Sequence, residues 1–180
     1  SEKFPVDAVV LDLFWFGDSI KGTLGNLDWM NKKAWPNPKA MIDTLRSKNI
    51  KTILVTEPFI LEGTKHYDSA KNFLAVDSTG HPYTLTDLYF GRGGLVDLFR
   101  ADARNWFWSK YDAQIRLGVA GWWGDLGEPE KHPVDMFHHG KDLGSKKPVR
   151  SDLVHNLYGH YWSKMLSEKY TAHYPQQRLF

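Results

Sequence analysis

Three acidic residues stand at or just after the ends of three short apolar segments, which is where residue type and position together suggest chemistry. Each acid belongs to a different segment: Asp12 to 8–15, Glu57 to 52–56 and Asp125 to 119–123. If the segments are parallel strands, their carboxyl ends meet at one edge of a sheet, where α/β proteins assemble active sites. Carboxylates grouped beside Trp side chains fit acid–base or nucleophilic chemistry on neutral polar rings, such as sugars. The alternative is that these acids cap helices or pair with Lys and Arg.

The densest group of such residues lies in segment 118–130, which reads Gly-Val-Ala-Gly-Trp-Trp-Gly-Asp-Leu-Gly-Glu-Pro-Glu. Its glycines permit close approach of the backbone and unusual dihedral angles. If the strand continues through both Trp residues, Trp122 and Trp123 point to opposite faces, so at most one lines a pocket. The segment is therefore the first candidate for the reacting part of a site.

Alternating strands and helices are predicted to position these acids. The strands are the three apolar segments, whose lack of alternation is typical of strands buried on both faces. Helices are predicted over 37–47, 102–117 and 152–170. Asn37 is the expected N-cap of the first, with Pro38 at its first helical position, and Asp152 is the expected cap of the last. This order favours parallel strands with helical crossovers, in an open sheet or a (β/α)8 barrel.

Other segments carry weaker signals. The stretch from about 60 to 96 is predicted to be an excursion with a turn at 77–80 and a small hairpin. Residues 178–180, Arg-Leu-Phe, are predicted to open a fourth strand.

Composition excludes several classes of protein. The 180 residues contain no Cys, which rules out a disulfide scaffold, a thiolate zinc site and a thiol nucleophile. The net charge of +2 is too small to indicate a nucleic-acid or anionic-membrane partner. No apolar stretch approaches the ~20 residues of a membrane span, and we expect no signal peptide in these residues. Eight Trp, eight Tyr and ten Phe indicate a large core, or flat surfaces for stacking on rings.

Several motifs, in one order along essentially the whole chain, resemble the catalytic barrel of glycoside hydrolase family 31, the α-glucosidase and α-xylosidase family. The motifs lie at 5–7, 11–15, 25–29, 56–59, 96–99, 121–130 and 155–159. The run at 121–130 is most similar to the bacterial branch that includes oligosaccharide 4-α-glucosyltransferases. The resemblance implies a parallel (β/α)8 TIM barrel, of which residues 1–180 form one fragment of a single catalytic domain: about strands 2–4 and the start of strand 5.

The resemblance also implies roles for individual residues. Asp125 matches the catalytic nucleophile, Asp12 the acid that holds hydroxyls of the sugar in the cleaved subsite, and Glu128 an acid that orients its neighbours. The other positions matched to the sugar pocket are Leu13, Phe14, Trp15, Trp123, Leu126 and, at a position that differs between branches, Glu57. Trp29, in the loop after the first strand, is the better candidate for an exposed sugar platform, ahead of Trp35. The general acid/base of the family lies beyond residue 180.

The implied activity is that of a retaining enzyme acting on α-glucan oligosaccharides without a cofactor, either an α-glucosidase or a 4-α-glucosyltransferase. Its mechanism is double displacement through a covalent glucosyl-aspartate. The implied partners are the oligosaccharide substrate, the rest of the barrel and neighbouring domains, and the resemblance suggests an exported bacterial protein. The 180 residues alone are expected not to hydrolyse substrate, because the second carboxyl group is absent.

Several alternatives stay open. The protein could be a non-catalytic or degenerate carbohydrate-binding protein, or an α-xylosidase. A phosphosugar isomerase or aldolase is disfavoured because no Lys ends a predicted strand. The glycines at 91–94 are a weak match to a phosphate loop. His132, Asp135 and His138 or His139 could bind a metal only if their loop were helical, so we expect no metal site and solvent-exposed side chains instead.

Overall fold

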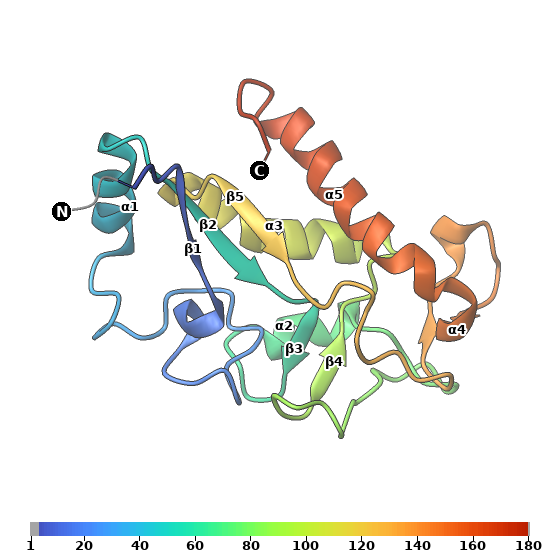
Figure 1. Cartoon of the computed structure of the whole chain (residues 1–180). Coiled ribbons are helices and arrows are strands. Elements are labelled where there is room, and N and C mark those ends of the chain that lie inside the picture. Colours follow the sequence, from blue (N-terminus) through green and yellow to red (C-terminus); the bar gives the residue numbers. More distant parts are fainter. Residues whose placement is uncertain (1–3, 180) are drawn as a thin grey trace.

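A three-stranded parallel sheet forms the centre of the computed structural model, which describes residues 4–179. The strands are β1 (Ala8–Leu11), β2 (Lys51–Thr56) and β5 (Gly121–Gly124), and they lie in the order β1–β2–β5. All three run toward the same end of the molecule (Figure 1). The predicted parallel α/β architecture is therefore confirmed.

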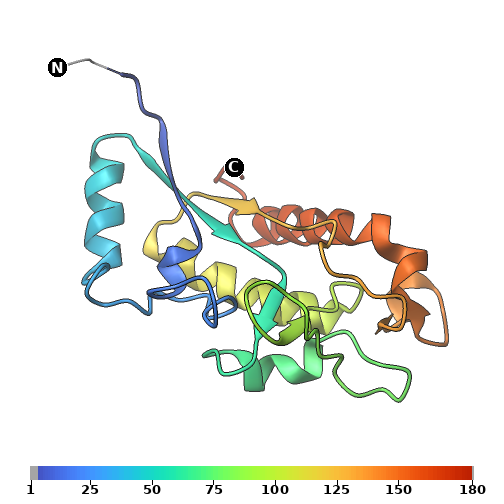
Figure 2. The ribbon, with the colours of Figure 1, turned by 60° about the horizontal axis from the view of Figure 1, so that its bottom comes forward.

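Three helices cover one face of this sheet. They are α1 (Pro38–Ser47), α3 (Ala101–Leu117) and α5 (Tyr158–His173), and they follow one another along that face (Figure 2). As predicted, Asn37 caps α1, with its Oδ1 accepting a hydrogen bond from the Ala40 amide at 3.0 Å. Among residues 4–179, no helix has the length and apolar character needed to cross a membrane.

The two faces of the sheet differ in exposure. Side chains on the helix side are buried, such as Leu54 at 0% and Trp122 at 9% exposed. On the opposite face, Val10 is 46% and Trp123 is 54% exposed. Trp122 and Trp123 thus point to opposite faces, as predicted, and only Trp123 stands on the face that the helices leave open.

The first predicted strand is shorter than expected. β1 ends at Leu11, and Leu13–Phe16 form a 3-10 helix instead of continuing the strand to residue 15. The Asp12 side chain is the cause, because its Oδ1 accepts a hydrogen bond from the Leu13 amide at 2.7 Å and caps the turn. Trp15 then anchors the turn by donating its indole N–H to the Val55 carbonyl at 3.0 Å.

The last predicted helix begins later than expected. α4 (Ser151–Val154) and a 3-10 turn, His155–Leu157, precede α5. Asp152 is not its cap, because it lies inside the first turn of α4 and its carboxylate pairs with Arg150 at 2.6 Å.

The excursion is closed by an antiparallel pair between its two ends: β3 (Phe59–Leu61) and β4 (Gly93–Leu95). It also holds the short helix α2 (Tyr67–Ala70) and a 3-10 turn, Lys71–Phe73. The predicted turn at 77–80 is present, and Asp77 Oδ1 accepts hydrogen bonds from the Thr79 and His81 amides. Two of the glycines at 91–94 lie in β4, which excludes a phosphate loop there: a Cβ on Gly93 would stand 2.4 Å from the Ile60 carbonyl oxygen.

A second antiparallel pair, β6 (Phe137–His138) and β7 (Val149–Arg150), lies in the loop before α4. Of the predicted fourth strand, Arg178 and Leu179 are not in strand conformation, and Phe180 lies outside the described residues.

Buried aromatic side chains join the sheet to its helices through hydrogen bonds. The Tyr111 hydroxyl, on α3, lies 2.9 Å from Thr56 Oγ1 and accepts the indole N–H of Trp162, on α5, at 3.0 Å. The indole N–H of Trp122, on β5, donates to the Tyr170 hydroxyl at 2.9 Å. Removing the hydroxyl at the centre of such a network leaves more than one buried polar group unpaired.

We therefore expect Tyr111→Phe to lower the free energy of unfolding by about 1–3 kcal/mol, since Thr56 and Trp162 both lose their partner. Denaturant unfolding of the whole protein that contains this chain is the measurement. Tyr161→Phe is the matched control, because the Tyr161 hydroxyl is exposed and makes one long hydrogen bond, 3.4 Å, to the Asp142 carbonyl. Equal effects of the two changes would contradict the expectation.

Candidate active site

The structure brings the three strand-end acids to one edge of the sheet. Asp12 follows β1, Glu57 follows β2 and Asp125 follows β5. The ladder between β2 and β5 continues to the last of them, because the Asp125 amide donates to the Thr56 carbonyl at 2.9 Å. Since side chains alternate along a strand, all three acids project on the face opposite the helices, in line with Val10, Val55 and Trp123.

Glu57 occupies the centre of this edge and is 1% exposed. Burial raises the pKa of its carboxyl group, and the charges of Asp125, Glu130 and Asp12 raise it further, to about 8. Within residues 4–179, neither Glu57 nor the acids on either side of it form an ion pair with Lys or Arg. The alternative that these acids pair with Lys and Arg is thus excluded for the described residues. Helix capping does apply to Asp12, which caps a turn while facing the site.

Asp125 lies in a loop that packs closely against α5. Its Oδ1 accepts a hydrogen bond from the Leu126 amide at 3.0 Å, and Leu126 has a φ of 51°, in the left-handed region that a β-carbon disfavours. The Trp162 indole packs directly beneath, because a Cβ on Gly127 would stand 3.1 Å from that ring. The start of α5 is equally close, since a Cβ on Gly159 would be 2.9 Å from the Gly127 carbonyl oxygen. The loop glycines therefore serve close packing, as the sequence indicates.

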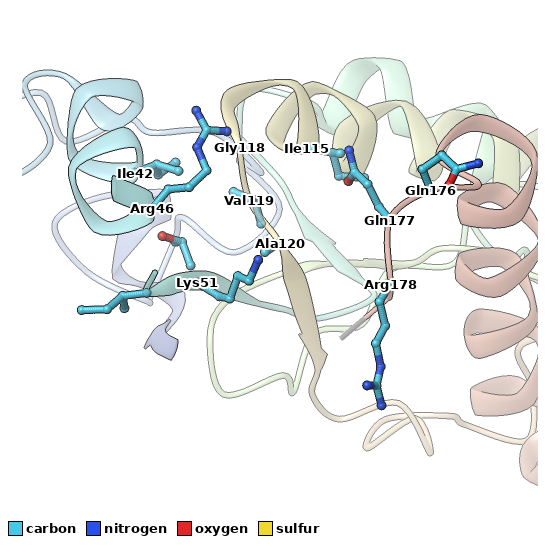
Figure 3. Close-up of a pocket in the computed structure, with 12 residues that line it drawn as sticks. Ile42, Arg46, Lys51, Ile115, Gly118, Val119, Ala120, Gln176, Gln177 and Arg178 are labelled. Carbon is cyan, nitrogen blue, oxygen red and sulfur yellow. The ribbon is translucent and has the colours of Figure 1, made fainter. Parts of the chain in front are cut away.

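A cleft of about 580 Å³ opens beside this loop. Its lining includes Asp125, Glu128, Trp162 and Leu179. A second cavity, of about 410 Å³, lies at the opposite end of the strands. Figure 3 shows that one between α1, the turn that precedes β5 and the C-terminal segment, lined by Arg46, Lys51, Val119, Gln177 and Arg178. It contains no carboxylate, and active sites of parallel α/β folds form at the other end, so we place the candidate site at the acids.

The remaining predicted pocket residues divide by exposure. Phe14 is 50% and Trp123 is 54% exposed, Leu126 is half-buried, and Glu128 is exposed. Leu13 and Trp15 are buried in the 3-10 turn behind Asp12. Phe14 and Trp123 are thus the aromatic side chains that the structure leaves free beside Asp12 and Asp125.

The expectation of an exposed platform at Trp29 is wrong. Trp29 is 1% exposed, and its indole N–H donates to Gln114 Oε1 at 2.7 Å, inside the core. Its ring centroid lies 5.4 Å from those of Trp15 and Trp35, so the three rings pack together. The sequence signal for this burial was Gln114, a polar residue on the apolar face of the helix 102–117.

Sequence reasoning also missed two contributors to the site. Glu130 adds a negative charge that acts on Glu57, and Trp162 forms the floor beneath Asp125. Glu130 had a signal, since it ends the acidic segment 118–130, whereas Trp162 is 37 residues away from Asp125 and nothing in the local pattern connects them.

The loop histidines form a partly buried chain of contacts. Asp97 Oδ1 contacts His138 Nδ1 at 2.9 Å, His138 contacts His132 at 2.6 Å, and His132 contacts His155 at 3.1 Å. The expectation of solvent-exposed loop residues is therefore wrong for His138, which is 0% exposed because Asp97 draws it into the core. Asp135, another proposed ligand, instead accepts a hydrogen bond from the Tyr83 hydroxyl. No cluster of His, Asp or Glu side chains within residues 4–179 has an arrangement suited to a metal ion.

Comparison with known proteins gives consistent matches. Residues 1–180 match the family model of the glycosyl hydrolases family 31 TIM-barrel domain. The chain is 27% identical over 166 residues to glucosidase 2 subunit alpha of Schizosaccharomyces pombe, a match covering 88% of this chain and 18% of that protein. It is 26% identical over 127 residues to alpha-xylosidase XylQ of Lactiplantibacillus pentosus, a match covering 69% of this chain and 16% of that protein.

Among solved structures, the fold is similar to a family 31 dextranase of Flavobacterium johnsoniae complexed with glucose. The TM-score is 0.79 and the identity 26%, and the match covers 98% of this chain and 21% of that one. The chain thus spans about a fifth of the length of the relatives that it matches. These matches identify β1, β2 and β5 as neighbouring strands of a (β/α)8 barrel, as predicted.

The histidine chain has a testable effect on stability. Burial, with the neighbouring His138 and His155, lowers the pKa of His132 to about 3, so His132 stays neutral in the folded protein at pH values where the unfolded chain binds a proton. Stability is therefore lost as the pH falls from about 6.5 toward 3. His132→Asn should flatten this part of a melting-temperature profile, whereas His160→Asn, at an exposed position, should leave it unchanged. An unaltered profile in the first variant would contradict the assignment.

Proposed function

The chain belongs to glycoside hydrolase family 31, and from this membership we propose that it carries the nucleophile half of a retaining enzyme acting on α-glucan oligosaccharides. The enzyme would be an α-glucosidase or a 4-α-glucosyltransferase. One observation carries the proposal: three carboxyl groups converge at the carboxyl ends of adjacent parallel strands, beside exposed aromatic rings, and none forms an ion pair with a Lys or Arg of residues 4–179. The glucose bound by the similar dextranase supports a sugar as the ligand.

Asp125 is proposed as the nucleophile. Its Oδ1 is engaged by the Leu126 amide, which fixes the orientation of the carboxylate and leaves the second oxygen for attack. That oxygen bonds to the anomeric carbon while the glycosidic C–O bond breaks, giving a covalent glucosyl ester through an oxocarbenium-like transition state. The leaving oxygen takes its proton from a second carboxylic acid, which the family resemblance places outside these residues.

The aromatic and acidic neighbours are proposed to bind the sugar. Trp123 stands two residues before Asp125 on the same face, so its exposed ring is placed to stack on the sugar. Asp12 is exposed at the end of β1 and is proposed to accept hydrogen bonds from sugar hydroxyls. The ester is then released by water, which gives hydrolysis, or by a hydroxyl of another sugar, which gives transfer.

Asp125→Asn in the whole protein should abolish turnover of maltooligosaccharides, with a loss of at least about 10⁴-fold, because an amide is a poor nucleophile. Asp135→Asn is the matched control, since it makes the same chemical change at a carboxylate that contacts Tyr83 outside the site. Near-normal turnover by the first variant would refute the nucleophile assignment, and binding of oligosaccharide without turnover by the unmodified protein would favour a non-catalytic carbohydrate-binding protein.

A small external nucleophile offers a sharper test. Asp125→Gly should regain turnover of an activated aryl α-glucoside when sodium azide is added, because azide occupies the space of the lost carboxylate and attacks the anomeric carbon itself. The product should be the β-glucosyl azide, identified by its anomeric configuration in NMR spectra. Recovery without inversion at the anomeric carbon would place the nucleophile elsewhere.

The preferred substrate and acceptor are determined by identifying the reaction products. We expect α-glucosides to be cleaved faster than α-xylosides. Oligomers longer than maltotriose that form early in its reaction indicate transfer. Thin-layer chromatography of the products distinguishes transfer from hydrolysis, which yields only glucose and maltose. Faster cleavage of the α-xyloside would instead match the similarity to the alpha-xylosidase.

A further inference from the structure

Glu57 has properties that a simple sugar ligand would not need. Its carboxyl group is 1% exposed, and its Oε2 has no hydrogen-bond partner within residues 4–179. A buried polar atom without a partner costs free energy, so it marks either strain or a contact made during function. Glu57 also directly follows the central strand of the three, between the proposed nucleophile and the proposed sugar-binding acid.

The charges around Glu57 are all of one sign. The groups that act on it are Asp125 from the end of β5, Glu130 from the following loop and Asp12 from the end of β1. The 3-10 turn packed beside it contributes apolar side chains, and β2 itself contributes Thr56. A carboxylate at this position would therefore face other carboxylates without a compensating cation from residues 4–179, which favours the protonated form.

Spacing explains why neutrality of the central acid matters. Adjacent strands lie about 4.8 Å apart, and Asp12 and Asp125 follow the two outer strands. Asp125 is level with Glu57 across the ladder, whereas Asp12 is level with Val55, so Asp12 and Asp125 are farther from each other than either is from Glu57. Coulomb repulsion falls with distance, so a neutral Glu57 removes the closest repulsive contact that each outer acid has within this group of three. The proposed chemistry requires both of them to be ionised.

We propose that Glu57 is a positioning residue that remains a protonated carboxylic acid through turnover, separates the charges of Asp12 and Asp125, and donates a hydrogen bond to the Asp125 carboxylate. The inference rests on the proposed function of Asp125. The donated hydrogen bond goes to Asp125 Oδ1, which also accepts from the Leu126 amide, so the second carboxylate oxygen stays free for attack. Glu57 transfers no proton to the substrate and remains protonated when the ester is hydrolysed.

The test compares Glu57→Gln with Glu57→Ala in the whole protein, using maltose and α-glucosyl fluoride. Gln preserves neutrality and an N–H donor, so it should lower kcat/KM about threefold, whereas Ala should lower it about 10- to 100-fold. The fluoride needs no protonation on departure, so its kcat/KM is independent of the general acid. That value should fall above pH 8 in the unmodified protein, where Glu57 ionises, and should not fall in Glu57→Gln.

Glu62→Gln is the matched control, because Glu62 pairs with Arg92 on the excursion, and it should leave this pH profile unchanged. Infrared difference spectra between the unmodified protein and Glu57→Gln provide a readout independent of activity. They should contain a protonated carboxyl band at pH 7 that disappears above pH 8.

Three results would overturn the role of Glu57. The first is the absence of the protonated carboxyl band at pH 7. The second is a fall in kcat/KM for the fluoride above pH 8 that persists in Glu57→Gln. The third is a Glu57→Gln variant that loses maltose turnover but keeps the fluoride reaction, which would make Glu57 the general acid. An unmodified protein that turns over neither substrate would overturn the proposed function itself, so the two failures are distinguishable.

Discussion

The parallel hydrogen-bond ladder from β1 through β2 to β5 is the constraint on which the site depends. It fixes the register of the three strands, and the bond from the Asp125 amide to the Thr56 carbonyl extends that register beyond the last strand. Because side chains alternate along each strand, a slip of one residue would turn an acid toward the helices. The site is thus determined by backbone pairing before any side chain contributes.

Packing from the helix side supports the same geometry. Trp162 lies under the loop that carries Asp125, and its indole N–H is held by the Tyr111 hydroxyl, which also contacts Thr56 at the end of β2. One buried network therefore connects the floor of the site with the strand that positions Glu57. The left-handed backbone at Leu126 is stable in this setting because the surrounding contacts restrict the loop on both sides.

Local signals in the sequence predicted the order of strands and helices, the cap of α1 and the convergence of the acids. The errors share a physical cause, which is a partner distant in sequence or a competing local hydrogen bond. Trp29 is buried because it bonds Gln114, 85 residues away, and His138 because it bonds Asp97, 41 residues away. β1 stops early because the Asp12 side chain accepts from the next amide, a contact that apolar patterning does not contain.

Burial and charge distinguish the three acids at the carboxyl ends of the strands, where Glu57 is level with Asp125 and Asp12 is level with Val55. The central acid is buried and has an acidic residue on each side, whereas each outer acid has Glu57 on one side only and is more exposed. Burial and strand order together thus set the central acid apart from the two outer ones. In the role proposed for Glu57, its neutral carboxyl group reduces the repulsion among the three acids without a cation from residues 4–179.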